Sequence, residues 1–327
     1  MEHVLCEICG VDDAQPYKSE NGQQAVQCRR CGLVYCNPRP SIAEMKQLYD
    51  GQETKVNVRA HLYQRDRKTI EARACLDLIQ RYRQGGRVLE IGSAAGYFLW
   101  EARKRGFAVQ GLDLTQKFVE FSERVLDVPA FEGTLQSAPF AAQSFDLVYL
   151  RNVMSHLAYP REELLTIAHL LAPGGHLVLE TGNVAELPAA EAGELELPDH
   201  LYHFSEENLR ALLATAGFRW VATHRYVLAD QLAGVRKLGE RFKKASPSKR
   251  RVEPRPIADS ELTLPRSRLV SRIAAHVITA GRYKLGAVLP ASGRRCSLVI
   301  VAERLAQPAA RASHAHRGGS SPRADGV

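Results

Sequence analysis

The chain has 327 residues, 45% of them hydrophobic and 24% charged, which is the composition of a globular protein with a sizeable core. No apolar run reaches the roughly 18–20 residues that a membrane-spanning helix needs, and the N-terminus lacks the features of a secretory signal. These observations predict a cytoplasmic protein with reduced thiols. The net charge of +8 is concentrated between Arg236 and Arg255, where nine basic residues stand against two acidic ones. This distribution favours a solvated basic segment over a nucleic-acid-binding face.

The first forty residues contain two cysteine pairs, Cys6 with Cys9 and Cys28 with Cys31, in the pattern C-x2-C-x18-C-x2-C. Two such turns supply four thiolates, a complete tetrahedral set for Zn²⁺. A glycine follows each pair and allows the backbone to fold back so that its amides face the sulfurs. The pattern predicts a zinc ribbon over residues 1–40 whose metal is structural, because no coordination position stays open. The alternatives are buried core cysteines or a redox pair.

Residues 41–86 have the pattern of a helical linker. Ser41 and Glu44 form the signature of a capping box, which predicts a helix running to about Tyr49. A longer charged helix is expected from about Arg59 to Arg83, where two glycines stop it.

From Arg87 onward, strand-like and helix-like segments alternate. The strand-like segments are "RVLEI", "FAVQGLDL", "FDLVYLR", "HLVLET", "FRWVATHRYV" and "RCSLVIVAER". Strands that alternate with helices of about ten residues predict an α/β fold, with a doubly wound, mostly parallel sheet over residues 87–305. A helical insertion is expected at about 230–295, and a disordered tail at 306–327. Ligands of such sheets bind at the carboxyl ends of the strands.

The turn after the first of these strands, in "VLEIGSAAG", argues for a cofactor other than a dinucleotide. A pyrophosphate requires G-x-G-x-x-G, but Ala94 stands in place of the second glycine and Tyr97 in place of the third. Asp113 ends the next strand 21 residues after Gly92, where its carboxylate can accept hydrogen bonds from ribose hydroxyls. The pattern therefore favours a smaller, zwitterionic cofactor that carries a ribose.

These motifs resemble those of class I S-adenosylmethionine-dependent methyltransferases, which have a Rossmann-like seven-stranded sheet. The resemblance runs through "VLEIGSAAG", "GLDLT", "GTLQSAPFAAQSFDLV" and "LLAPGGHLVLETGN". More narrowly, "CGLVYCNPRPS" and "DHLYHFSEENL" resemble segments of bacterial methyltransferases that carry an N-terminal zinc ribbon and act on sugars, polysaccharide precursors and secondary metabolites.

The resemblance implies which residues contact S-adenosylmethionine. The set comprises Glu90, Gly92, Ser93 and Gly96 around the methionine end, Asp113 at the ribose, Leu114, Thr134 and Leu135 at the adenine, and Arg151 beside the amino acid portion. In two places the chain departs from the family. Ala94 replaces the middle glycine, so this residue is expected to avoid positive φ. Ser155 replaces a glutamate, which argues against metal-assisted chemistry.

Methyl transfer is an in-line displacement, so the protein must align the acceptor with the methyl group and exclude water. A hydroxyl acceptor needs a general base, and histidine suits neutral pH. His156 follows the fourth strand, and His200 and His203 follow the fifth, so all three are expected at the carboxyl edge of the sheet. A resemblance to zinc-containing sugar methyltransferases favours His200 as the base, with Asp199 and Tyr202 as substrate contacts. From their positions after the strands, His156 is expected as a second catalytic residue and His203 as a further substrate contact. The alternative is that these residues cap loops or pack.

Within the insertion, "SRLVSRIAAHVITAGRYKLGAVLP" has apolar residues at helical spacing with basic residues between them. The pattern predicts either a lid or packing helix, which we favour, or an amphipathic surface in peripheral contact with a membrane.

The sequence as a whole predicts a methyltransferase that moves a methyl group from S-adenosylmethionine to a small-molecule acceptor, at oxygen rather than carbon. One alternative is a methyltransferase of ribosomal or other RNA, against which the nearly neutral ribbon without interleaved aromatic residues argues. Another is a cofactor-binding protein without transfer activity.

Overall fold

The computed structural model describes residues 1–41, 44, 58–227 and 262–306. The helix expected to reach Tyr49, the basic segment 236–255 and the expected C-terminal tail therefore lie outside the described residues.

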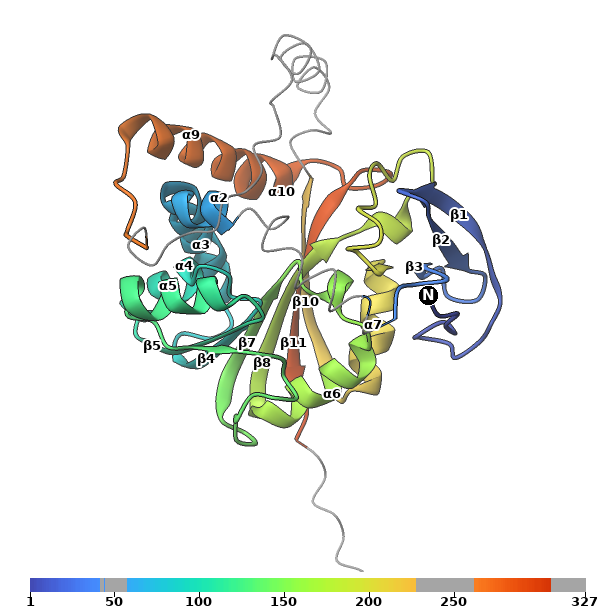
Figure 1. Cartoon of the computed structure of the whole chain (residues 1–327), viewed down its shortest axis with the longest axis horizontal. Coiled ribbons are helices and arrows are strands. Elements are labelled where there is room, and N and C mark those ends of the chain that lie inside the picture. The colour runs from blue at the N-terminus through green and yellow to red at the C-terminus, as the bar shows by residue number, and fades with distance from the viewer. Residues whose placement is uncertain (42–43, 45–57, 228–261, 307–327) are drawn as a thin grey trace, which may run out of the picture.

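The centre of the molecule is a seven-stranded sheet in the order β10-β11-β8-β7-β4-β5-β6 (Figure 1). The strands are β4 (Gly86–Ile91), β5 (Phe107–Asp113), β6 (Ala130–Glu132), β7 (Phe145–Arg151), β8 (Leu171–Gly182), β10 (Phe218–Val227) and β11 (Cys296–Arg304). The strands from β8 through β7, β4 and β5 to β6 are all parallel to their neighbours. β11 is antiparallel to both of its neighbours, β10 and β8. This arrangement confirms the predicted α/β, Rossmann-like methyltransferase fold.

Helices cover both faces of this sheet, which explains why consecutive residues of its inner strands β4 and β7 are buried. Val88 of β4 faces a core built with α3 (Arg65–Ile79), α4 (Tyr97–Lys104) and α5 (Gln116–Leu126). Leu89, the next residue, faces a second core built with α6 (Pro160–Leu170) and α7 (Glu206–Thr215). The side chains of a strand alternate between its two faces, so neighbouring residues belong to different cores.

The single helix expected from about Arg59 to Arg83 is two helices, so this prediction is wrong. α2 (Val58–Tyr63) ends before Gln64, and α3 begins at Arg65 and ends at Ile79. Gln64 has φ −88° and ψ 27°, which lies outside the helical region. The charged sequence is uniform in composition and therefore contains no signal for this break.

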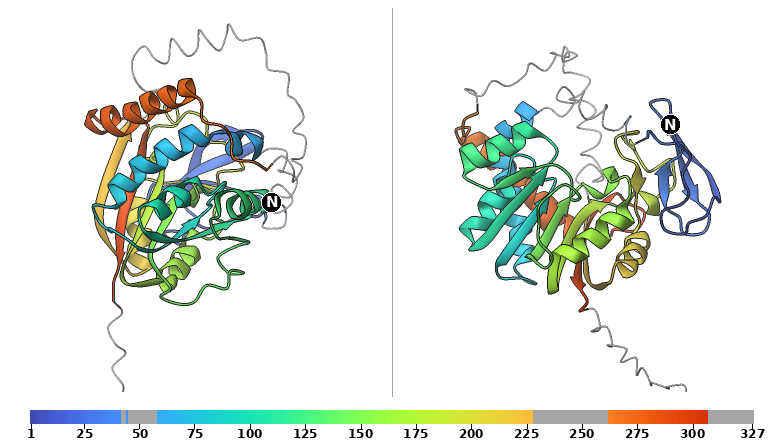
Figure 2. Two further views of the ribbon diagram at one scale, coloured as in Figure 1. Left: turned by 90° about the vertical axis from the view of Figure 1, so that its left-hand side faces the viewer. Right: turned by 60° about the horizontal axis from the view of Figure 1, so that its bottom comes forward.

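A second sheet forms the N-terminal part of the molecule, in the order β1-β2-β3-β9. Its strands are β1 (Ala14–Glu20), β2 (Gln23–Cys28), β3 (Val34–Cys36) and β9 (Tyr202–His203). The first three belong to the expected ribbon, but β9 comes from the loop before α7, and it pairs antiparallel with β3. The ribbon therefore packs against the edge of the central domain, as Figure 2 shows from two sides.

The described part of the expected insertion is helical. α9 (Leu269–Ala280) continues through one π-helical turn, η6 (Gly281–Leu285), into α10 (Gly286–Val288). α9 lies along α3 on the outside of the molecule (Figure 1). None of the helices within the described residues has the length and the apolar character needed to cross a bilayer.

Candidate functional site

The turn that follows β4 is shaped by close contacts as well as by glycine. Gly92 has φ +69°, and a Cβ at this position would lie 2.5 Å from Cγ2 of Val153. Gly96 has φ +74°, and its Cβ would lie 2.5 Å from Oγ of Ser122. Neither position has room for a side chain, and both have a backbone that glycine adopts without strain. The turn can therefore bring its backbone close to a ligand at the carboxyl edge of the sheet.

Ala94 occupies the left-handed region with φ +45°, so the expectation that it avoids positive φ is wrong. The carboxylate of Asp113 explains how this conformation is held. Its Oδ2 accepts a hydrogen bond of 2.7 Å from the backbone N–H of Ala94, and its Oδ1 accepts one of 2.9 Å from that of Thr115. Asp113 thus joins the turns that follow β4 and β5 before any ligand is considered.

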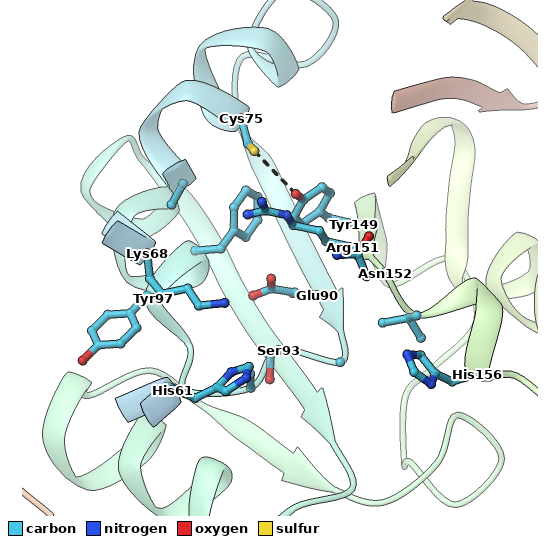
Figure 3. Close-up of a pocket in the computed structure, with 16 residues that line it drawn as sticks. His61, Lys68, Cys75, Glu90, Ser93, Tyr97, Tyr149, Arg151, Asn152 and His156 are labelled. Carbon is cyan, nitrogen blue, oxygen red and sulfur yellow. Dashed lines mark hydrogen bonds between the residues drawn. The ribbon is translucent and has the colours of Figure 1, made fainter. Parts of the chain in front are cut away.

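A cavity of about 330 Å³ opens beside this turn (Figure 3). Four of the predicted cofactor contacts line it, namely Glu90, Gly92, Ser93 and Arg151. Lys68 enters from α3 and points toward the carboxylate of Glu90 (Figure 3). The cavity is therefore lined by both basic and acidic side chains, which suits a zwitterion.

Glu90 is a buried carboxylate whose hydrogen bonds are incomplete. Its Oε2 and the Oγ of Ser93 have no hydrogen-bond partner among the described residues. Burial raises the pKa of Glu90 well above its usual value, although Lys68 and Arg151 oppose this effect. An acceptor left unsatisfied in a low-dielectric site costs free energy until a donor reaches it. The cavity is therefore suited to a ligand that carries N–H or O–H donors.

Arg151, at the end of β7, is held by two acidic side chains. Its Nη1 lies 3.1 Å from Oε2 of Glu71, and its Nε lies 3.4 Å from Oε2 of Glu180. Both glutamates are buried. Because its partners are shielded from water, the guanidinium is fixed in orientation at the cavity wall.

A second cavity, of about 310 Å³, adjoins the first. It is lined by four further predicted contacts, namely Asp113, Leu114, Thr134 and Leu135. Leu114 is 56% exposed although it is apolar, so a flat ring bound here would cover surface that is unfavourable in water. Gly92, Val153 and His156 line both cavities, so the two form one elongated site. Gly96 does not line either cavity.

A histidine cluster stands at the junction of the two cavities. The ring of His156 lies 4.5 Å from that of His200, measured between centroids, and the two rings are nearly perpendicular. Nδ1 of His156 lies 3.0 Å from the backbone oxygen of Asp199 and 3.6 Å from its Oδ1. The pKa of His200 is lowered to about 4, mainly by burial and to a smaller extent by the neighbouring His156. The His200 ring is therefore neutral at physiological pH and keeps a lone pair that can accept a hydrogen bond, although burial also makes it a weaker base than an exposed histidine.

Of the three predicted substrate contacts, only Asp199 lines one of these two cavities. Tyr202 is buried, and its hydroxyl accepts a hydrogen bond of 2.9 Å from Nη1 of Arg39 and donates one of 3.2 Å to the backbone oxygen of Ala158. His203 is also buried and pairs with Val34 of the ribbon. The structure thus puts Tyr202 and His203 at the junction with the ribbon. His200 contacts His156 but does not itself line either cavity.

The four ribbon cysteines converge at one point. The ligand atoms of Cys6, Cys9, Cys28 and Cys31 all lie within 4.8 Å of one another. The N–H of Gly10 donates to the backbone oxygen of Cys6, and the N–H of Gly32 does the same to Cys28. Both glycines have positive φ, which turns each loop back on its pair as the sequence predicts. Four clustered sulfurs are a donor set that suits tetrahedral Zn²⁺.

Residues that precede the central domain also line the first cavity, and the sequence analysis missed them. His61 comes from α2, and Lys68 and Cys75 come from α3. Burial lowers the pKa of His61 to about 4. These residues belong to the segment expected to be a linker, and no motif in the sequence marks them as part of a site.

Comparisons with known proteins agree with this geometry. Residues 63–223 match the family model described as a methyltransferase domain. A tRNA U34 carboxymethyltransferase of Pseudomonas putida is 32% identical over 146 residues, which cover 41% of this chain and 46% of that protein. A ubiquinone biosynthesis O-methyltransferase of Caulobacter sp. is 33% identical over 106 residues, which cover 31% and 42% of the two proteins. The chain thus spans less than half the length of these curated relatives.

Among solved structures, the [4+2]-cyclase SpnF is similar over 83% of this chain and 99% of its own, with a TM-score of 0.52 and 18% identity. At this identity the likeness concerns the fold alone. The family model and this solved structure thus indicate a region that resembles a methyltransferase domain, on a fold shared with that cyclase.

Proposed function

We propose that this chain, whose residues 63–223 match a methyltransferase domain, transfers a methyl group from S-adenosylmethionine to an oxygen atom of a small-molecule acceptor. The observation that carries the proposal is the pair of adjoining cavities at the carboxyl edge of the sheet. One is charged and the other partly apolar, and a histidine stands where they meet.

The residues of the two cavities fit the proposed cofactor. The unsatisfied Oε2 of Glu90 and Oγ of Ser93 are acceptors for the donors of an amino acid group, and Arg151 can pair with its carboxylate. Asp113 has lone pairs left for ribose hydroxyls, and Leu114 offers an apolar surface to the adenine. When bound, S-adenosylmethionine supplies a methyl group that its positive sulfur activates for displacement.

The acceptor's proton is the remaining requirement for methylation at oxygen. His200 is neutral at physiological pH because burial lowers its pKa to about 4, and it contacts His156 at the cavity wall. We propose that His156 contacts the acceptor, that His200 accepts the proton directly or through His156, and that Asp199 holds His156 in place. Replacing His200 with Ala should leave the affinity for S-adenosylhomocysteine unchanged and slow transfer by about 10²–10⁴-fold. An unchanged rate would return His200 to a packing role.

The same histidine cluster must be tested for metal binding. The ligand atoms of His156, Asp199 and His200 lie within 4.8 Å of one another, and this set of nitrogen and oxygen donors also suits a divalent transition metal. Transfer is therefore measured before and after brief treatment with a chelator, with the zinc content of the ribbon checked in parallel. Activity that survives supports the base. Activity that is lost and then restored by Mn²⁺ would assign the cluster to a metal instead.

The acceptor class is tested with isotope-labelled S-adenosylmethionine and a cell extract divided into small-molecule and RNA fractions. Label in the small-molecule fraction supports the proposal, and mass spectrometry then identifies the product. The named relatives include a tRNA-modifying enzyme and a ubiquinone biosynthesis enzyme, so RNA is the second candidate. Label that is lost after ribonuclease treatment would favour RNA, as would binding that weakens steeply with salt.

We further propose that Cys6, Cys9, Cys28 and Cys31 hold one structural Zn²⁺. A Cys28→Ser variant should lose the zinc that elemental analysis finds in the parent protein, and it should unfold at a lower denaturant concentration. The matched control is Cys75→Ser, because Cys75 is a buried cysteine distant from the ribbon in the fold. Equal zinc content in all three proteins would contradict the assignment.

A further inference from the structure

The helix α9 exposes an apolar face that points away from the other residues that the structure describes. Leu269, Val270, Ile273, Val277 and Ile278 are each more than half exposed, and Val270 reaches 79%. The buried residues of α9 are the small Ala275 and Thr279. Each residue of a helix advances by about 100°, so Ala275 and Thr279 lie almost opposite Ile273 and Val277. The helix thus contacts the protein through small residues and directs its large apolar ones outward.

The anchoring of α9 argues that this orientation belongs to the fold. α9 lies along α3, and η6 continues it inward, where the hydroxyl of Tyr283 lies 3.2 Å from Sγ of Cys75. Arg282 pairs with the buried Glu180. At the other end of the helix, the carboxylate of Asp66 accepts a hydrogen bond from the backbone N–H of Arg268. Because both ends are fixed, α9 cannot rotate its apolar face toward the core.

The charge of this region indicates what could cover the face. From Leu262 to Arg295 the sequence has seven lysines and arginines and no acidic residue. Of these, Arg266, Arg268, Arg272 and Lys284 are exposed. Asp66 is the acidic side chain that contacts the start of α9. An exposed apolar stripe flanked by basic side chains is the pattern of a helix that lies in the interface of an anionic membrane. A second copy of the chain would instead bring like charges together across a two-fold axis.

We propose that α9 docks this chain on the surface of an anionic lipid bilayer, with its large apolar side chains among the acyl chains and its basic residues among the headgroups. α3, against which α9 packs, lines the first cavity through Lys68 and Cys75. Docking therefore holds the candidate site one helix away from the membrane. The proposal does not depend on methyl transfer.

Co-sedimentation of the full chain with vesicles tests the proposal. The probes are vesicles of phosphatidylcholine alone and vesicles in which about a third of the lipid is phosphatidylglycerol. We expect binding to the anionic vesicles, at least about ten-fold weaker binding to the neutral ones, and a loss of binding as salt rises. The double variant V270E/V277E should bind anionic vesicles at least about ten-fold more weakly, because both side chains would place a charge in the apolar layer.

The matched control is Leu165→Glu, an exposed apolar residue of α6. This helix lies far from α9 in the view of Figure 1. It should bind as the parent does. All the substituted residues are exposed, so each variant should keep the parent's circular dichroism spectrum and unfolding midpoint. The proposal is overturned if the parent does not bind anionic vesicles, or if V270E/V277E binds as tightly as the parent. A parent dimer that V270E/V277E converts to a monomer, without vesicle binding by either, would instead assign the face to a second copy.

Discussion

Replacing Asp113 with Asn should weaken both the fold and the proposed cofactor site. The two carboxylate oxygens accept backbone N–H groups from Ala94 and Thr115, at 2.7 and 2.9 Å. An asparagine keeps one acceptor oxygen and turns its NH₂ group toward the second N–H, so one charge-assisted bond is lost. A hydrogen bond to a charged group contributes about 1.5–3 kcal/mol. Burial raises the pKa of Asp113, so removing its charge offsets part of this loss, and we expect the free energy of unfolding to fall by less than that amount. Lost contacts to the ribose should weaken cofactor binding by about 5–150-fold, or roughly 1–3 kcal/mol.

Two measurements on the same preparations separate these effects. Urea unfolding without ligand gives the change in stability, and titration calorimetry with S-adenosylhomocysteine gives the change in affinity. Glu132→Gln is the matched control, because this exposed carboxylate ends β6 directly beside Asp113 in the sheet. We expect it to match the parent in both assays. If Asp113→Asn matches the parent in both unfolding free energy and affinity for S-adenosylhomocysteine, then Asp113 neither stabilises the turn nor contacts the ribose.

Three further changes test the electrostatics and the backbone of the site. Glu90→Gln should raise the free energy of unfolding of the unliganded chain near neutral pH while weakening the binding of S-adenosylhomocysteine. Burial raises the pKa of Glu90, so the native state favours the protonated form, and the penalty for ionising it grows as pH rises above the usual value of 4.5. A stability gain that is equal at about pH 5 and about pH 8 would contradict this. Ala94→Gly should stabilise the chain by about 0.5–1 kcal/mol, because glycine adopts φ +45° without strain, and a lower urea midpoint would refute this. Burial lowers the pKa of His203 from 6.5 to about 3. Below pH 6.5 the unfolded chain therefore binds more protons at this residue than the native chain does. The contribution of His203 to stability is lost as the pH falls from 6.5 toward 3. His203→Gln should flatten the acid side of the stability profile between these values, and an unchanged slope would exclude His203 as a cause.

The central sheet could be predicted because its strands carry their own signal. The inner strands contain buried apolar stretches, at 147–150 in β7, 177–179 in β8 and 298–302 in β11, and this is what burial on both faces requires. β6 is only Ala130–Glu132, which is too short to show a period, so the seventh strand came from the resemblance rather than from the pattern. β9 is only Tyr202–His203 and pairs with residues near the N-terminus, so nothing in its neighbourhood predicts it.

The candidate site could be predicted where local sequence determines it, and not where distant elements meet. The turn around Gly92 and the carboxylate of Asp113 lie on adjacent strands of one motif, so their spacing places both at the same edge of the sheet. Lys68 reaches the cavity only because α3 packs against α4, which depends on tertiary contacts. Likewise, the apolar period of α9 shows that the helix has an apolar face, but the same period describes a face turned toward the core or away from it.

β9 pairs with β3, and this pairing indicates what the small ribbon contributes to the central domain. The N–H of Cys36 donates to the backbone oxygen of Leu201, and the N–H of Leu201 donates to that of Ser155. One short stretch of backbone thus joins the ribbon to the two loops that carry His156 and His200. A two-residue strand cannot hold its place without a partner, because its few hydrogen bonds do not offset the entropy of ordering the loop. β3 supplies that partner, and β3 in turn depends on the turns that the cysteines close. The ribbon therefore helps to position His156 and His200. Any interaction that stabilises the ribbon should also order the two loops that carry these histidines.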